Sequence, residues 1–155
     1  KALTGGTMGL GAAAAANKVF DAFLSGDPGH ALMHGPTFMA NPLACAAANA
    51  SLDLFECDPR LAQVAAIEAA LLRDLEPARH FPNVRDVRVK GAIGVIELGR
   101  IADLDGLKRR FIEAGVFVRP FRNIVYLTPA FTISAEELNR LTGAVVSVLD
   151  EWTRL

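Results

Sequence analysis

Three short stretches carry side chains whose chemistry could serve a binding or catalytic site. The first contains Lys1, at the start of the small-residue segment Lys-Ala-Leu-Thr-Gly-Gly. A lysine amine can form a Schiff base with an aldehyde, and a tight turn of small residues can hold that amine at one point. Composition alone equally allows a solvated lysine with no chemical role.

The second stretch is His-Gly-Pro-Thr-Phe, residues 34–38, just before a predicted helix. The Thr37 hydroxyl and the free backbone N–H groups near a helix start suit a phosphate oxygen. Gly35 allows a ligand to approach the backbone closely, and Pro36 fixes the turn. The same residues could also form a purely structural turn that leads into the helix.

The third stretch is Val-Arg-Pro-Phe-Arg-Asn-Ile-Val-Tyr, residues 118–126. Arg119 has apolar neighbours, so we expect it to be poorly solvated and to have a carboxylate partner. Bidentate geometry suits either a protein carboxylate or a carboxylate ligand. Tyr126 could line a site or belong to the core.

Composition restricts the class of protein. Of 155 residues, 52% are hydrophobic and 21% charged, which is typical of a globular chain with a core. The net charge of −1 and the absence of a basic run argue against nucleic acid or an anionic membrane as partner. We expect no signal peptide and no membrane span, because the apolar runs are far shorter than about 20 residues.

Cysteine and histidine usage predicts neither a disulfide framework nor a metal site. Cys45 and Cys57 form no Cys-x-x-Cys pair, and the three histidines show no metal-ligand spacing. This usage fits a reducing compartment, so we expect a cytoplasmic protein without a bound metal.

The elements that would position these residues fall into two groups. For residues 1–16 we expect a buried strand or a tight crossing of small residues. For residues 17–25 the apolar spacing predicts an amphipathic helix. Asn41 as N-cap and Pro42 begin a helix that runs to about Phe55. Its many alanines predict close packing on several sides. We interpret residues 1–58 as the tail of a larger domain.

Residues 59–155 predict a separate α+β domain with an antiparallel or mixed sheet. The expected order is a helix over 60–79, strands over 84–91 and 92–99, a helix over 104–115, strands over 116–121 and 123–129, and a helix over 135–152. Asp86 interrupts the alternation of the first strand, Gly115 ends the middle helix, and Ser134 with Glu137 forms a capping box.

Taken together, the stretches resemble the class III aminotransferases, which use pyridoxal phosphate. "KALTGG" resembles the lysine turn of this family, and "MHGPTFMANPLACAAANASL", residues 33–52, is a more specific match. "VRDVRVKGAIGVIE" and "GVFVRPFRNIVYLTP" extend the resemblance over essentially the whole chain. It implies an α/β fold, the fold-type I pyridoxal-phosphate transferase architecture. The chain would be its C-terminal part, with residues 1–58 from the large domain and 59–155 the small domain.

The resemblance also implies a reaction and a cytoplasmic homodimer. The strings favour a family member that transfers an amino group from S-adenosylmethionine to 8-amino-7-oxononanoate, giving 7,8-diaminononanoate in biotin synthesis. Lys1 matches the Schiff-base lysine, and Pro36 with Thr37 matches the phosphate contact that serves the neighbouring subunit's site. Gly35 matches a substrate-contacting backbone position, Arg119 the arginine for the acceptor carboxylate, and Tyr126 falls near the site.

Several cofactor contacts of the family precede the lysine and have no counterpart in these 155 residues: the aspartate for the pyridine nitrogen, the stacking aromatic and the Gly-Ser phosphate loop. We therefore expect the chain by itself to bind the cofactor poorly and to have no useful turnover. Two alternatives stay open: another class III aminotransferase acting on an ω-amino acid with 2-oxoglutarate, and a non-catalytic α+β binding or dimerisation module.

Overall fold

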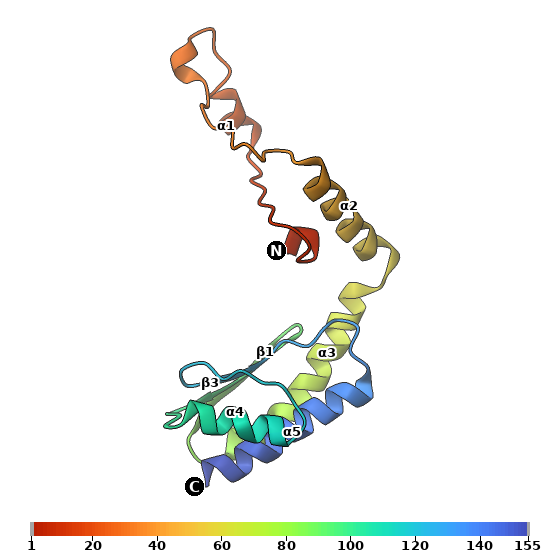
Figure 1. Ribbon diagram of the computed structural model, residues 1–155, viewed down its shortest axis with the longest axis vertical. Coiled ribbons are helices and arrows are strands. Elements are labelled where there is room, and N and C mark those ends of the chain that lie inside the picture. Colours follow the sequence, from red (N-terminus) through yellow and green to blue (C-terminus); the bar gives the residue numbers. More distant parts are fainter. Residues whose placement is uncertain (1, 155) are drawn as a thin grey trace. The chain divides into compact units, whose positions relative to one another are not determined.

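The computed structural model describes residues 2–154, and the chain divides into two units between Asp58 and Pro59 (Figure 1). We call residues 1–58 the first unit and residues 59–155 the second unit, and each is described by itself. No helix within residues 2–154 is long and apolar enough to cross a membrane.

Over residues 2–58, the first unit consists of three short helical segments and one longer helix, joined by extended connections. Its elements are a 3-10 helix Ala2–Thr4, α1 Asn17–Asp21, a 3-10 helix Pro28–His30 and α2 Pro42–Cys57. The predicted start of α2 is confirmed: the Asn41 side chain accepts hydrogen bonds from the backbone N–H groups of Leu43 and Ala44. α2 contacts the 3-10 helix Ala2–Thr4.

Two expectations for the first unit are wrong. Residues 2–16 contain no strand and are mostly exposed, because these small side chains offer too little apolar surface to anchor an extended segment. α2 is not packed on several sides, since Ala44 is its one buried residue. Large apolar side chains of the unit face outward, among them Met33 at 92% and Phe38 at 78% exposure.

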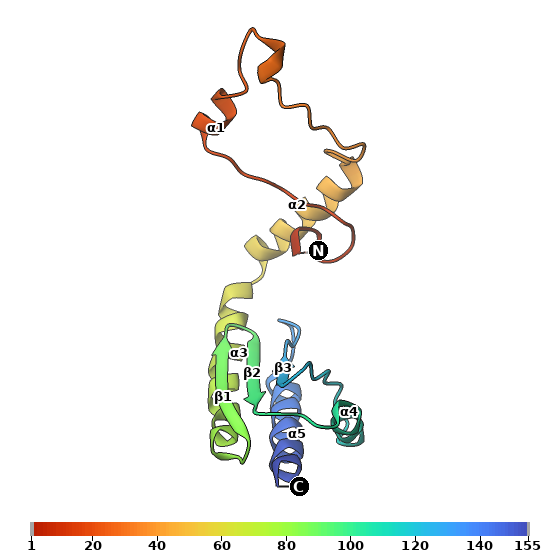
Figure 2. The ribbon, with the colours of Figure 1, turned by 90° about the vertical axis from the view of Figure 1, so that its left-hand side faces the viewer.

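The second unit is a three-stranded antiparallel sheet with helices on one face. Its elements are α3 Arg60–Leu75, a 3-10 helix Glu76–His80, β1 Val84–Lys90, β2 Ile93–Leu98, α4 Leu104–Glu113, β3 Ile124–Leu127 and α5 Ala135–Thr153. The strands lie in the order β1-β2-β3. Figure 2 shows α3 and α5 running behind the strands, with α4 to the side.

The core of this unit lies between the sheet and the helices. Val87, Ile96 and Val125 are register partners across the three strands, and all three are buried. Leu71 of α3 and Leu149 of α5 are fully buried against them. Because side chains alternate between the two faces of a strand, the opposite face carries Arg88, Val95 and Tyr126, which are also register partners. Tyr126 therefore lies on the face of the sheet opposite the core.

Local sequence signals explain where several elements bend or begin. The register of β1 shifts between Val84 and Asp86, where the alternation is interrupted. α3 ends at Leu75, earlier than expected, because Pro77 in the following turn cannot donate a helical hydrogen bond. The capping box at Ser134 is confirmed, with both reciprocal hydrogen bonds to Glu137 present.

The predicted strand over residues 116–121 is wrong. Only Phe121 forms a bridge, in a tight turn with Ile124. Pro120 within the segment disfavours a regular ladder. Burial nevertheless alternates along it as in a strand: Val118 and Pro120 are buried, whereas Phe117, Arg119 and Phe121 are exposed. The segment is thus extended and anchored, without being a strand.

Candidate functional site

The predicted site residues fall into three groups. Lys1 lies outside the described residues. Gly35, Pro36 and Thr37 lie in the connection that precedes α2, in the first unit. Arg119 and Tyr126 lie together in the second unit, on the segment after α4 and on β3.

The turn between residues 121 and 124 brings Arg119 beside Tyr126. Phe121 and Ile124 exchange both backbone hydrogen bonds, at 2.9 and 3.0 Å. Continuing this antiparallel register by two residues places Arg119 opposite Tyr126 with both side chains on one face. Both residues accordingly line two adjoining hollows, of about 250 and 500 Å³.

Arg119 has no carboxylate partner among residues 2–154, and its side chain is exposed rather than shielded as expected. The reason is the alternation described above: burial of Val118 and Pro120 turns Arg119 outward. Its guanidinium carbon lies 6.0 Å from the ring centroid of Phe117. This arginine is therefore held at the rim of a hollow with its hydrogen-bonding capacity available to a ligand.

Arg88, on the same face of the sheet as Tyr126, provides a contrast. It donates hydrogen bonds to Asp86 at 2.9 Å and to Glu97 at 2.8 Å. The hydrogen bond to Glu97, followed by that to Asp86, raises the pKa of Arg88, and the hydrogen bond from Arg88 lowers the pKa of Asp86. Arg88 is thus paired with two protein carboxylates through Nη1, whereas Arg119 has no carboxylate partner within residues 2–154 and is the better partner for an anionic ligand.

Lys108 supplies a second positive charge beside Arg119, and the sequence did not predict this. It lines the 500 Å³ hollow together with Arg119 and Tyr126, and its amine lies 3.0 Å from the Asp105 carboxylate. Spacing along the chain could not reveal it, because Lys108 belongs to α4 and meets Arg119 only through the fold.

The connection that contains residues 35–37 presents free donors. The Pro36 carbonyl accepts a hydrogen bond from the Met39 N–H at 2.9 Å, which closes a turn around Thr37. Within residues 2–154, neither the Thr37 hydroxyl nor its backbone N–H has a partner. No atom approaches a Cβ built on Gly35 within 4 Å, so space exists beside its backbone. This turn can donate two hydrogen bonds to an anion.

The residues that follow Lys1 form a fixed turn. Gly5 and Gly6 both have positive φ, at 59° and 87°, where other residues would be strained. The Thr4 hydroxyl, which is buried, donates to the Met8 carbonyl and accepts from the Met8 N–H. The backbone geometry of the Thr-Gly-Gly stretch therefore favours glycine at both positions.

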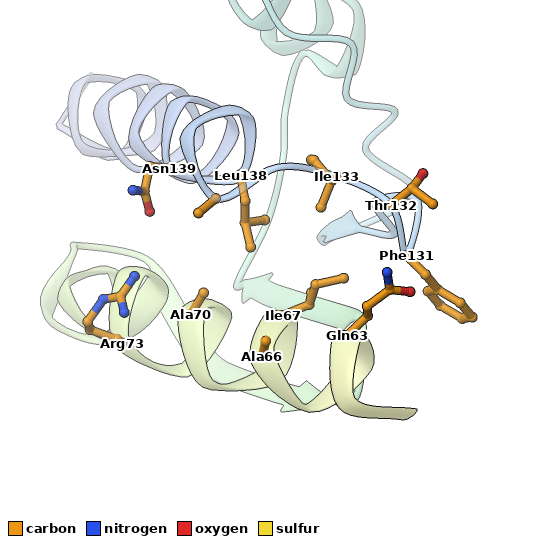
Figure 3. Close-up of a pocket in the computed structure, with 11 residues that line it drawn as sticks. Gln63, Ala66, Ile67, Ala70, Arg73, Phe131, Thr132, Ile133, Leu138 and Asn139 are labelled. Atoms are coloured by element: carbon orange, nitrogen blue, oxygen red, sulfur yellow. The ribbon is translucent and has the colours of Figure 1, made fainter. Parts of the chain in front are cut away.

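A further cavity of about 430 Å³ lies between α3 and the start of α5 (Figure 3). Ala66, Ile67 and Leu138 point toward its interior, whereas Gln63 and Asn139 lie at its edge. None of the predicted site residues lines this cavity. The cavity is separate from the hollows beside Arg119.

The family model for aminotransferase class III matches residues 1–149. The chain belongs to the class III aminotransferases. The matched range includes the connection before α2 and the Arg119 segment.

Curated relatives of this family cover nearly the whole chain. An adenosylmethionine-8-amino-7-oxononanoate aminotransferase from Buchnera aphidicola subsp. Acyrthosiphon pisum is 40% identical over 151 residues, which is 97% of this chain and 35% of the relative. The enzyme of that name from Mycobacterium leprae is 45% identical over 148 residues, 96% of this chain and 34% of the relative. The chain thus spans about a third of the length of these relatives.

Solved structures of aminotransferases share the fold. The adenosylmethionine-8-amino-7-oxononanoate aminotransferase of Methanocaldococcus jannaschii aligns with a TM-score of 0.74 and 26% identity, over 87% of this chain and 34% of that one. A pyridoxal-phosphate-bound amine transaminase from an uncultivated Pseudomonas species aligns with a TM-score of 0.68 and 29% identity, over 79% and 30%. The predicted α/β fold of a pyridoxal-phosphate transferase is confirmed.

Proposed function

We propose that this chain is part of a pyridoxal-phosphate-dependent aminotransferase of biotin synthesis, which moves an amino group from S-adenosylmethionine to 8-amino-7-oxononanoate. The observation that carries the proposal is Arg119 beside Tyr126, because Arg119 has no carboxylate partner among residues 2–154 and the acceptor ends in a carboxylate. The names of the curated relatives support the choice of substrates.

The residues present fit pyridoxal phosphate. The Thr37 hydroxyl and N–H supply two donors for its phosphate, and the turn at Pro36 holds them in place. When bound, the cofactor supplies the electron sink that amino transfer requires. In this proposal, the Lys1 amine would hold the cofactor at its aldehyde and would carry the proton during amino transfer.

The other side chains bind and orient the acceptor. Arg119 takes its carboxylate in bidentate geometry, which fixes the far end of the molecule. Tyr126 lines the same hollow and limits the space beside that carboxylate. Gly35 leaves the backbone accessible to substrate.

The proposal includes a cytoplasmic homodimer in which Thr37 serves the neighbouring subunit's site. The exposed apolar residues on both sides of Thr37 support a covered surface there: Met33 at 92%, Phe38 at 78% and Met39 at 58% exposure. Two free cysteines, Cys45 and Cys57, support a reducing compartment.

The test is the donor half-reaction of the full-length protein, followed by the absorbance change of the cofactor. We expect the amino form of the cofactor to appear with S-adenosylmethionine and not with ornithine or 4-aminobutyrate. Addition of 8-amino-7-oxononanoate should then restore the starting spectrum. Conversion by the ω-amino acids in place of S-adenosylmethionine would assign the protein to another branch of the family. A cofactor that never attaches to Lys1, tested by borohydride trapping, would favour a non-catalytic module.

A further inference from the structure

Phe117 lies on the same exposed face as Arg119. Alternation along the extended segment buries Val118 and Pro120, so side chains two residues apart point in the same direction. Phe117 is 77% exposed, because the residues that this alternation turns inward are Val118 and Pro120. Core packing therefore does not explain this aromatic ring.

The ring instead contacts the guanidinium. The Arg119 guanidinium carbon lies 6.0 Å from the Phe117 ring centroid, at the outer limit of a cation–π contact. Both residues line the 250 Å³ hollow together with Tyr126. Within residues 2–154, Arg119 has no carboxylate partner, and Phe117 supplies the aromatic ring that lies at cation–π distance from it.

We propose that Phe117 is a positioning residue, which holds the Arg119 guanidinium ready for the substrate carboxylate. This inference rests on the proposed function, because it assigns Arg119 to a carboxylate. A stacked guanidinium keeps its planar edge free, so it can still donate both hydrogen bonds to a carboxylate. Holding it in advance reduces the conformational entropy that binding must otherwise remove.

The experiment compares Phe117→Leu with Phe117→Trp in the full-length enzyme. Leucine keeps an apolar side chain and loses the aromatic face, whereas tryptophan provides a stronger one. We expect Phe117→Leu to raise the KM for 8-amino-7-oxononanoate about two- to fivefold with unchanged kcat, the range for a cation–π contact at an exposed site. Phe117→Trp should restore the wild-type KM.

Two controls separate positioning from a general structural effect. Phe131→Leu removes another exposed phenylalanine of the second unit and should leave the KM unchanged. In an Arg119→Ala background, Phe117→Leu should have no further effect on the KM, because the group it positions is absent. An effect of Phe117→Leu that persists in that background, or a loss in kcat that tryptophan does not restore, would overturn the inference.

A binding measurement distinguishes failure of this inference from failure of the proposed function. Heptanoate carries the carboxylate and an apolar chain but cannot accept an amino group, so its dissociation constant can be measured without turnover. Weaker heptanoate binding in Phe117→Leu, in a protein that does not convert 8-amino-7-oxononanoate, would retain the positioning role and reject the substrate. Equal heptanoate binding in wild type and Phe117→Leu would reject the positioning role itself.

Discussion

Two arginines near Tyr126 differ in what they can do, and the difference lies in their partners. Arg88 is held by two carboxylates, whereas Arg119 contacts an aromatic ring and faces a hollow. The sequence predicted that Arg119 needs a carboxylate and left open whether protein or ligand supplies it. It did not predict that Arg119 is exposed, because apolar neighbours along the chain can be buried while the residue between them points outward.

Replacing Arg119 by alanine in the full-length enzyme should impair the acceptor half-reaction and largely spare the donor half-reaction. Loss of a hydrogen bond to a charged group costs about 1.5–3 kcal/mol, which corresponds to a loss of about 10- to 150-fold in acceptor kcat/KM. Single-turnover kinetics of each half-reaction measures this. Arg109→Ala, which removes an exposed arginine on α4, is the matched control. An equal loss in both halves would assign Arg119 a structural role.

At the scale of elements, the sequence predicted helix starts and strand irregularities best where a residue next to the boundary determines it. Asn41, the capping box at Ser134 and the interruption at Asp86 all lie where the structure has a helix start or a register shift. The prediction failed at residues 2–16, whose small side chains bury too little apolar surface, and at residues 116–121, where Pro120 disfavours a regular ladder. A strand also needs a partner along its length, and alternation within one segment does not show whether that partner is present.

The capping box predicts how the second unit responds to acid. The Ser134 backbone N–H, and then its hydroxyl, donates to Glu137 and lowers the pKa of that carboxyl. A carboxyl whose folded-state pKa lies below its unfolded-state pKa stabilises the fold above the unfolded pKa. That contribution disappears as the pH falls through the folded pKa. Glu137→Gln should therefore lose less stability than wild type when the pH falls from about 5 to about 3.

The measurement is urea unfolding of this chain followed by the fluorescence of Trp152, the single tryptophan, which packs against the core of the second unit. Glu136→Gln is the matched control, since Glu136 lies in the same first turn of α5 but outside the capping box. Parallel pH profiles of wild type and Glu137→Gln would contradict the role given to the hydrogen bonds at Ser134.

At the scale of the whole molecule, the predicted site residues are divided between the two units of the chain. Thr37 belongs to the first unit, whereas Arg119 and Tyr126 belong to the second. The sequence could connect them only through resemblance to a family, because no spacing or periodicity relates residue 37 to residue 119. The structure adds what resemblance could not supply, namely the pairing that sets Arg119 opposite Tyr126 and the presence of Lys108.

Hybrid dimers of the full-length protein test whether Thr37 serves the neighbouring site. One subunit carries Lys1→Ala and the other Thr37→Ala. If Thr37 acts across the dimer, the site with an intact lysine also receives an intact threonine, so the hybrid should have about half the wild-type activity per dimer. If Thr37 acts within its own subunit, each site has one defect. Activity no higher than that of the Thr37→Ala homodimer, measured on hybrids purified by two different tags, would reject the shared site.

The distribution of buried residues has a consequence for how this chain melts. The core cluster lies entirely between Ile67 and Leu149, whereas Thr4 and Ala44 are the buried residues among positions 2–58. An all-or-none transition requires a core that all parts of a chain share. The first unit should therefore lose its hydrogen-bonded turns at far lower urea than the second, and its amide protons should exchange with solvent almost freely. We therefore expect urea unfolding of these 155 residues, followed by amide hydrogen exchange, to show the first unit opening separately from the second.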